Sequence, residues 1–178
     1  MSEFNEVVAR RRSVRAYDAT KPVSKEELEE LVKTAMEAPS WGNFQVPRNH
    51  IVTTPEMMEK LRGCMAPVNA KTTTGAQALI VNTYVKGKSG FHQGVQVNEL
   101  GEAWGAYDAG LQNAFLLLKA SEMGLDSIVL GLRDADKIKE LLSIPENEAV
   151  VSIIAIGHRV KDAVRPKRKA LEEIAKFY

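Results

Sequence analysis

Cysteine is almost absent from this 178-residue chain, and its scarcity excludes two kinds of site. Cys64 is the only cysteine, so the chain has no internal disulfide framework and no cysteine-based metal site. The three histidines, His50, His92 and His158, are far apart and show no metal-ligand spacing. We therefore expect no metal site. A lone cysteine is more often inert than nucleophilic, and both interpretations of Cys64 stay open.

The chain also lacks an excess of charge of one sign and any long apolar run. It has 24 basic and 23 acidic side chains and a formal net charge of +1, whereas general nucleic-acid or membrane binders need a broad basic face. No apolar run approaches membrane-spanning length, and the N-terminus lacks the apolar core of a signal peptide. We expect a soluble cytoplasmic protein with one domain over residues 1–178 and with no nucleic-acid or membrane partner.

Basic residues are concentrated in one short segment near the N-terminus. Four arginines and one serine fall within residues 10–15, after a short predicted helix. In an extended segment, alternate side chains share a face, so Arg11, Ser13 and Arg15 are expected on the same side. Guanidinium groups bind phosphate oxygens in pairs, so this spacing suits a single phosphate-bearing ligand. The alternative is a solvated basic helix end that complements the helix dipole.

The first half of the chain mixes helical and strand patterns. Ser2 is a candidate cap for the first helix. Ser24 and Glu27 form a capping-box pattern that starts a second helix, and Pro39 ends it. Residues 38–43 read as a loop, 50–53 and 79–85 as strands, 55–62 as a helix and 86–93 as a glycine-rich surface loop.

The second half predicts the longest helix, over residues 103–123. Its apolar residues occupy most of the circumference, so we expect burial on several sides, in the monomer core or in a subunit interface. Gly124 is placed to end this helix in a left-handed conformation. A strand over 127–130, a helix starting at Asp134 or Asp136, a strand over 149–156 and a basic tail follow. Strands and helices do not alternate strictly, which favours the α+β class.

Several motifs in order resemble the nitroreductase family of flavoproteins. They are Arg11-Arg12-Ser13-Val14-Arg15, Ala38-Pro39-Ser40-x-x-Asn43-x-Gln45, Gly124-Leu125, Ile156-Gly157-His158 and Pro166-Lys167-Arg168. The resemblance spans the chain. It implies a nitroreductase-like α+β fold with a mostly antiparallel central sheet flanked by helices. It also implies a homodimer with FMN at the interface and a C-terminal tail that extends onto the partner subunit.

The resemblance also implies roles for individual positions. The arginine segment (Arg11, Arg12, Ser13 and Arg15) should hold the phosphate, ribityl chain and pyrimidine edge of FMN. The tail residues Lys167 and Arg168 should reach the same phosphate. Pro39, Ser40, Trp41 and Asn43 should contact the flavin bound by the other subunit. Asn69 and Lys71 should face the pyrimidine end of the flavin. Backbone groups near the last strand but one should border its ring, at Ile128, Val129, Leu130 and Gly131. No side chain is assigned as catalytic, because FMN carries the chemistry.

The activity implied is FMN-dependent transfer of two electrons from NADH or NADPH to nitroaromatic, quinone or related small-molecule acceptors, by a ping-pong mechanism. The alternative is a non-catalytic protein that binds FMN or another phosphate ligand as a carrier or sensor. Two departures from the family pattern bear on substrate choice. Trp41 stands where the best-known members have a smaller residue, and Gln45-Val46-Pro47 stands where many have Gln-Pro-Trp. Residues 87–98 are the only candidate for a substrate lid.

Overall fold

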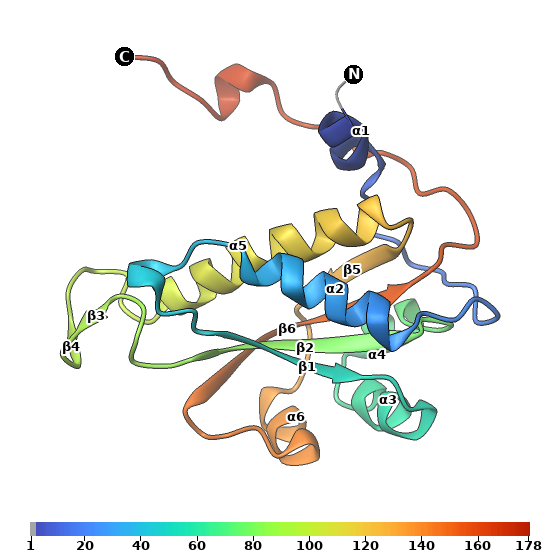
Figure 1. The fold of residues 1–178 in the computed structure, drawn as a ribbon, viewed down its shortest axis with the longest axis horizontal. Helices are drawn as coiled ribbons and strands as arrows, with labels where there is room; N and C mark the ends of the chain where they lie inside the picture. Colours follow the sequence, from blue (N-terminus) through green and yellow to red (C-terminus); the bar gives the residue numbers. More distant parts are fainter. Residues whose placement is uncertain (1–2) are drawn as a thin grey trace.

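A four-stranded antiparallel sheet forms the centre of residues 3–178, the part of the chain that the computed structural model describes (Figure 1). Its strand order is β1-β2-β6-β5. The strands are β1 (Pro47–Val52), β2 (Ala78–Val85), β5 (Asp126–Leu130) and β6 (Glu148–Gly157). All three strand pairs are antiparallel. The predicted strands are confirmed, although the first begins three residues earlier than the pattern indicated. The α+β class is also confirmed.

Helices cover both faces of this sheet and make a three-layered molecule (Figure 1). Strand β2 shows the alternation that this requires. Leu79 and Val81 belong to an apolar cluster with α3 (Pro55–Arg62) and α6 (Ala135–Leu142). Ala78 and Ile80 belong to a second cluster with α2 (Lys25–Met36) and α5 (Ala103–Glu122). Both faces of the two central strands are therefore buried, which explains their continuous apolar runs.

The helix ends follow the local signals in the sequence. The capping box of α2 is confirmed, because Ser24 Oγ accepts a hydrogen bond from the Glu27 amide at 3.1 Å and the Glu27 carboxylate accepts one from the Ser24 amide at 2.8 Å. Asp134 caps α6 by accepting from the Lys137 amide. Gly124 follows α5 with φ +77°, as predicted. Helix α1 (Glu3–Arg10) is present, while the proposed cap Ser2 lies outside the described residues.

A short helix and a small hairpin are among the elements that were not predicted. Helix α4 (Pro67–Thr72) occupies a stretch without a recognised motif, and proline at its first position is compatible with a helix start. Residues 87–98, the candidate substrate lid after β2, contain a small hairpin formed by β3 (Phe91–His92) and β4 (Val95–Gln96). Both elements are too short to leave a clear periodic pattern in the sequence.

Helix α5 buries mainly one of its faces in the single chain. Its buried face carries mostly small and polar residues: Gly105, Asp108, Ala109, Gln112, Asn113, Leu116, Ala120 and Ser121. Tyr107 and Phe115 remain 58% and 38% exposed. Burial on several sides is therefore wrong for the single chain. The other expectation, a subunit interface, stays a prediction.

The C-terminal tail leaves the body of the molecule after β6 (Figure 1). It contains one short 3-10 turn, η2 (Leu171–Glu173), and its apolar side chains Ile174 and Phe177 are exposed. None of the helices within residues 3–178 combines the length and apolar character needed to cross a lipid bilayer.

Candidate functional site

The arginine segment runs along the open edge of β5. The Val14 amide donates to the Ser127 carbonyl at 3.0 Å, and Ser13 forms a bridge to the same residue. Val14 is buried, whereas Ser13 and Arg15 are exposed. The predicted alternation therefore holds here, and the edge of the sheet presents Ser13 and Arg15 to solvent.

Arg12 has a structural role as well as a charge. Its guanidinium donates to the carbonyls of Ala9 and Arg11 at the end of α1. Burial lowers the pKa of Arg12 below its ordinary value, and nearby arginines lower it further: Arg165, Arg11, Arg168 and Arg159. Because these cations repel one another, a bound anion would stabilise the cluster. The donor set therefore fits a phosphate group.

Two members of this cluster, Arg159 and Arg165, were not assigned from the sequence. Arg159 is held by the buried Asp126, whose Oδ1 accepts from the guanidinium Nε at 2.8 Å and whose Oδ2 accepts from the backbone amide at 2.7 Å. This pair fixes the start of the tail to β5. Asp126 is the first residue of β5 and Arg159 follows β6, and a pairing across that separation in sequence leaves no local signal.

The tail residues predicted to bind phosphate are both exposed. Arg168 donates to the Pro166 carbonyl at 3.3 Å. Its positive charge is among those that lower the pKa of Arg12. Lys167 is exposed beside it. The structure therefore brings Arg168 to the arginine segment, and it shows no corresponding interaction for Lys167 within the described residues.

Helix α4 brings Lys71 close to Arg15. The two side chains line one surface cavity of about 440 Å³, together with Tyr17 and Val68. Asn69 lies on the same helix, and its Nδ2 donates to the Leu132 carbonyl at 3.1 Å. Lys71 is thus a second cation beside the arginine segment, while Asn69 anchors the chain that follows β5.

The predicted backbone positions after Ser127 lie on an edge strand. Ile128, Val129 and Leu130 belong to β5, which pairs with β6 on one side only. Gly131 follows the strand and is exposed. On its other side β5 is bridged only at Ser127 within the described residues. An open strand edge offers backbone donors and acceptors to a ligand.

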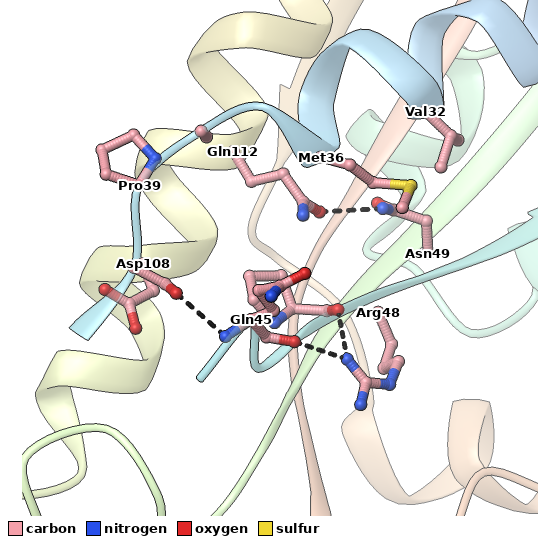
Figure 2. A pocket seen from close by; sticks show the side chains of 11 residues that line it. Val32, Met36, Pro39, Gln45, Arg48, Asn49, Asp108 and Gln112 are labelled. Atoms are coloured by element: carbon pink, nitrogen blue, oxygen red, sulfur yellow. Dashed lines mark hydrogen bonds between the residues drawn. The ribbon is translucent and has the colours of Figure 1, made fainter. Parts of the chain in front are cut away.

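The second group of predicted residues surrounds the turn η1 (Trp41–Asn43). Pro39 and Ser40 line a pocket of about 250 Å³ with Asn49 and Gln112, whose amides face one another at 2.9 Å (Figure 2). Ser40 Oγ accepts from the Gln45 amide at 2.9 Å. Trp41 packs against Trp104, with ring centroids 4.6 Å apart. Asn43 is exposed and has φ +57°.

Asp108 positions this turn and was missed by the sequence reasoning. It is 2% exposed, and both of its carboxylate oxygens accept from the Trp41 amide at 3.1 Å. Ser89 Oγ donates to it at 2.5 Å. Asp108 therefore ties the turn and the loop after β2 to α5. The sequence contains a feature that could have identified Asp108, because it is the only acidic residue from Ala103 to Ser121.

The two groups lie at opposite ends of α5 (Figure 1). Asp108 holds the turn with Trp41, whereas Arg10, at the start of the arginine segment, donates to the carbonyl of Ser121 and to that of Glu122. The span from Asp108 to Ser121 is roughly 20 Å along a helix axis. Within one chain the structure does not bring Pro39–Asn43 to the arginine segment.

Cys64 is buried in the apolar cluster that contains residues of α3 and α6. Burial raises the pKa of its thiol, and the Asp134 carboxylate raises it further, while Lys137 acts in the opposite direction. A raised pKa keeps the thiol protonated at neutral pH. The environment favours the inert interpretation of this residue.

Residues 8–158 match the model of the nitroreductase family. The chain belongs to the nitroreductase family. It is 30% identical to the NADPH-flavin oxidoreductase of Vibrio harveyi over 162 residues. This alignment covers 89% of this chain and 66% of the Vibrio harveyi protein. Membership and such relatives indicate an oxidoreductase.

Solved structures agree with the nitroreductase fold. A nitroreductase family protein of Clostridium difficile superposes with a TM-score of 0.82 at 26% identity, covering 99% of this chain and 98% of the other. A protein of Exiguobacterium sibiricum, solved in complex with FMN, superposes with a TM-score of 0.86 at 24% identity, covering 100% and 98%. The predicted family and fold are thus confirmed.

Proposed function

We propose that this nitroreductase family protein is an FMN-dependent oxidoreductase. It passes two electrons from NADH or NADPH to nitroaromatic, quinone or related acceptors by a ping-pong mechanism. The observation that carries the proposal is the arginine cluster around Arg12, on the segment along the open edge of β5 whose Arg15 lines a cavity with Lys71. A planar cofactor that carries a phosphate needs a cluster of cations for the phosphate and an adjacent cavity for the ring.

Each part of this surface has a separate task. Arg12 and Arg168 hold the phosphate, and Ser13 and Arg15 continue the same exposed edge. FMN supplies hydride acceptance and donation when it is bound. Lys71 holds a positive charge near the pyrimidine end, where negative charge develops on reduction, and such charge costs less beside a fixed cation. The backbone at the open edge of β5 would border the bound ring on one side.

We also propose that the site is completed by a second copy of the chain. Pro39, Ser40, Trp41 and Asn43 lie at the far end of α5 from the arginine segment, so a partner subunit has to supply them. A homodimer would also cover the exposed Tyr107 and Phe115 of α5. The tail, with Ile174 and Phe177 exposed, extends onto the partner in this arrangement.

The test is spectroscopic. The purified protein should be yellow, or become yellow on reconstitution with FMN, and the flavin absorbance should bleach when NADH or NADPH is added under argon. Adding a nitroaromatic compound or a quinone should restore the absorbance. A yellow protein that does not bleach would instead be a carrier or sensor, and a protein that cannot take up FMN would overturn the proposal.

A further inference from the structure

A second cleft lies beside the turn that carries Asn43, and the proposed function does not use it. It has a volume of about 410 Å³ and separates the end of that turn from the loop after β2. Phe44 and Phe91 line it with Arg48 and Lys88. Phe44 is 49% exposed and Phe91 is half-buried. The cleft therefore combines two aromatic rings with two cations.

Neither cation of this cleft forms a salt bridge within residues 3–178, although the Arg48 charge acts on the Glu148 carboxylate, whose pKa it helps to lower. Arg48 and Lys88 are exposed and form no salt bridge there, and no acidic residue lines the cleft. The Arg48 NH1 donates to the carbonyls of Gln45 and Pro47, each at 2.8 Å. These bonds orient the guanidinium, and its other nitrogens have no hydrogen bond to a described residue. An anionic ligand is the partner that such a pair lacks.

The backbone around Phe44 holds its ring out toward solvent. Asn43 and Gln45, on either side of it, have φ values of +57° and +50°. Left-handed conformations are costly for residues other than glycine and are often found at functional sites. The Gln45 amide is held by Ser40, the same residue that lines the first pocket. The turn thus maintains an exposed aromatic ring next to the proposed flavin contacts.

We propose that this cleft binds the electron acceptor as a planar aromatic anion. The aromatic ring packs against Phe44 and Phe91, and a carboxylate or similar group binds Arg48 and Lys88. The inference rests on the proposed function, because Phe44 directly follows Asn43, which belongs to the group expected at the flavin. It narrows the acceptors to aromatic compounds that carry a negative group.

The test compares two probes that differ mainly in charge, 4-nitrobenzoate and 4-nitrobenzamide. Isothermal titration of the protein as purified should show roughly tenfold tighter binding of the anion, because two cations face it. Lys88→Gln should weaken binding of 4-nitrobenzoate about two- to fivefold, as expected for an exposed charge pair. It should leave binding of 4-nitrobenzamide unchanged, and added salt should reduce the difference between the probes.

Lys86→Gln is the matched control, because Lys86 is exposed on the same loop, does not line the cleft, and makes the same change in net charge. It should leave both affinities unchanged. Phe44→Ala should weaken binding of both probes alike, since it removes the ring contact and no charge. Equal binding of the two probes, or equal losses in Lys86→Gln and Lys88→Gln, would overturn the inference.

The outcome is separable from the proposed function. Flavin that bleaches with NADH, in a protein that binds both probes equally, leaves the oxidoreductase proposal intact and removes this one. Binding of 4-nitrobenzoate that depends on Lys88, in a protein that cannot take up FMN, would keep the aromatic-anion site but overturn its role as the acceptor site together with the oxidoreductase proposal.

Discussion

Arg12 and Arg15 show how neighbouring arginines divide structural and binding tasks. The Arg12 guanidinium satisfies carbonyls at the end of α1, where four carbonyl groups lack partners within the helix. Arg15 is exposed, and among the described residues its guanidinium donates only to the nearby Ser13 carbonyl. Loss of Arg12 would therefore disturb the helix end as well as a ligand, so the exposed arginines test the phosphate site more cleanly.

Arg15→Ala and Arg168→Ala should each weaken FMN binding. A charge-assisted hydrogen bond contributes about 1.5–3 kcal/mol, which corresponds to roughly a ten- to hundredfold loss in affinity. Flavin fluorescence during titration of the apoprotein measures this. Lys176→Ala is the control, because Lys176 is an exposed cation of the same tail outside the arginine cluster. Unchanged FMN affinity in both arginine variants would contradict their assignment.

From the surroundings of Glu148 we predict how the stability of the fold changes in acid. It is 8% exposed, accepts a hydrogen bond from Thr83 Oγ1 at 2.5 Å and lies 2.9 Å from His50 Nε2. Burial raises the pKa of Glu148, but the hydrogen bonds with Thr83 and His50 outweigh it, so the pKa falls below its ordinary value of 4.5. The ionised form therefore stabilises the fold above that pH, and this contribution is lost as the pH falls through the lowered pKa.

The free energy of unfolding should consequently decrease less steeply with acidification in Glu148→Gln than in the natural protein. Urea unfolding at a series of pH values below 5 measures this slope, where carboxylates of ordinary pKa begin to titrate. Glu146→Gln is the control, since that carboxylate is almost fully exposed. Parallel slopes for Glu148→Gln and the natural protein would refute the role of Glu148.

At the scale of elements, features set by neighbouring residues could be predicted and features set by distant contacts could not. The capping box at Ser24 and the left-handed Gly124 are local, and both were found. Which face of α5 is buried depends on the sheet beneath it. There Gln112 receives a hydrogen bond from Asn49, and Asn113 donates to Asn82. Such pairings have no signature in a hydrophobic pattern, so the apolar circumference of the helix did not reveal which face the sheet covers.

Gly105 is the residue that permits this close packing of α5 on β2. A Cβ there would lie 2.2 Å from the Tyr84 ring. Gly105→Ala should therefore destabilise the fold by about 1–3 kcal/mol, the usual cost of overpacking, although alanine favours a helix. Chemical denaturation measures the change. Adding Tyr84→Ala should recover part of the loss, since the two residues are in contact. Strict additivity of the two effects would exclude the proposed clash.

At the scale of the whole molecule, the sequence resemblance located both halves of the candidate site, and the structure adds that one chain cannot join them. The arginine segment depends on the edge of β5, and the turn at Trp41 depends on Asp108. These anchors lie at the two ends of a rigid helix, so a modest loop movement cannot close the gap. Two-fold symmetry would place each turn against the arginine segment of the other subunit and create two equivalent sites.

Mixed dimers test this arrangement directly. One chain carries Arg15→Ala with Arg168→Ala, and the other carries Pro39→Glu, which sets a carboxylate against a phosphate-bearing ligand. Each variant alone should bind FMN poorly, because each of its two sites holds one defect.

Co-expression with two different tags and tandem purification isolates the mixed dimer. One of its sites collects both defects and the other has none, so it should hold about one flavin per dimer, half the natural content. Thermal melting of each parent variant verifies that it folds. Recovery of no flavin in the mixed dimer, or full FMN binding by a chain that sediments as a monomer, would show that the site lies within one subunit.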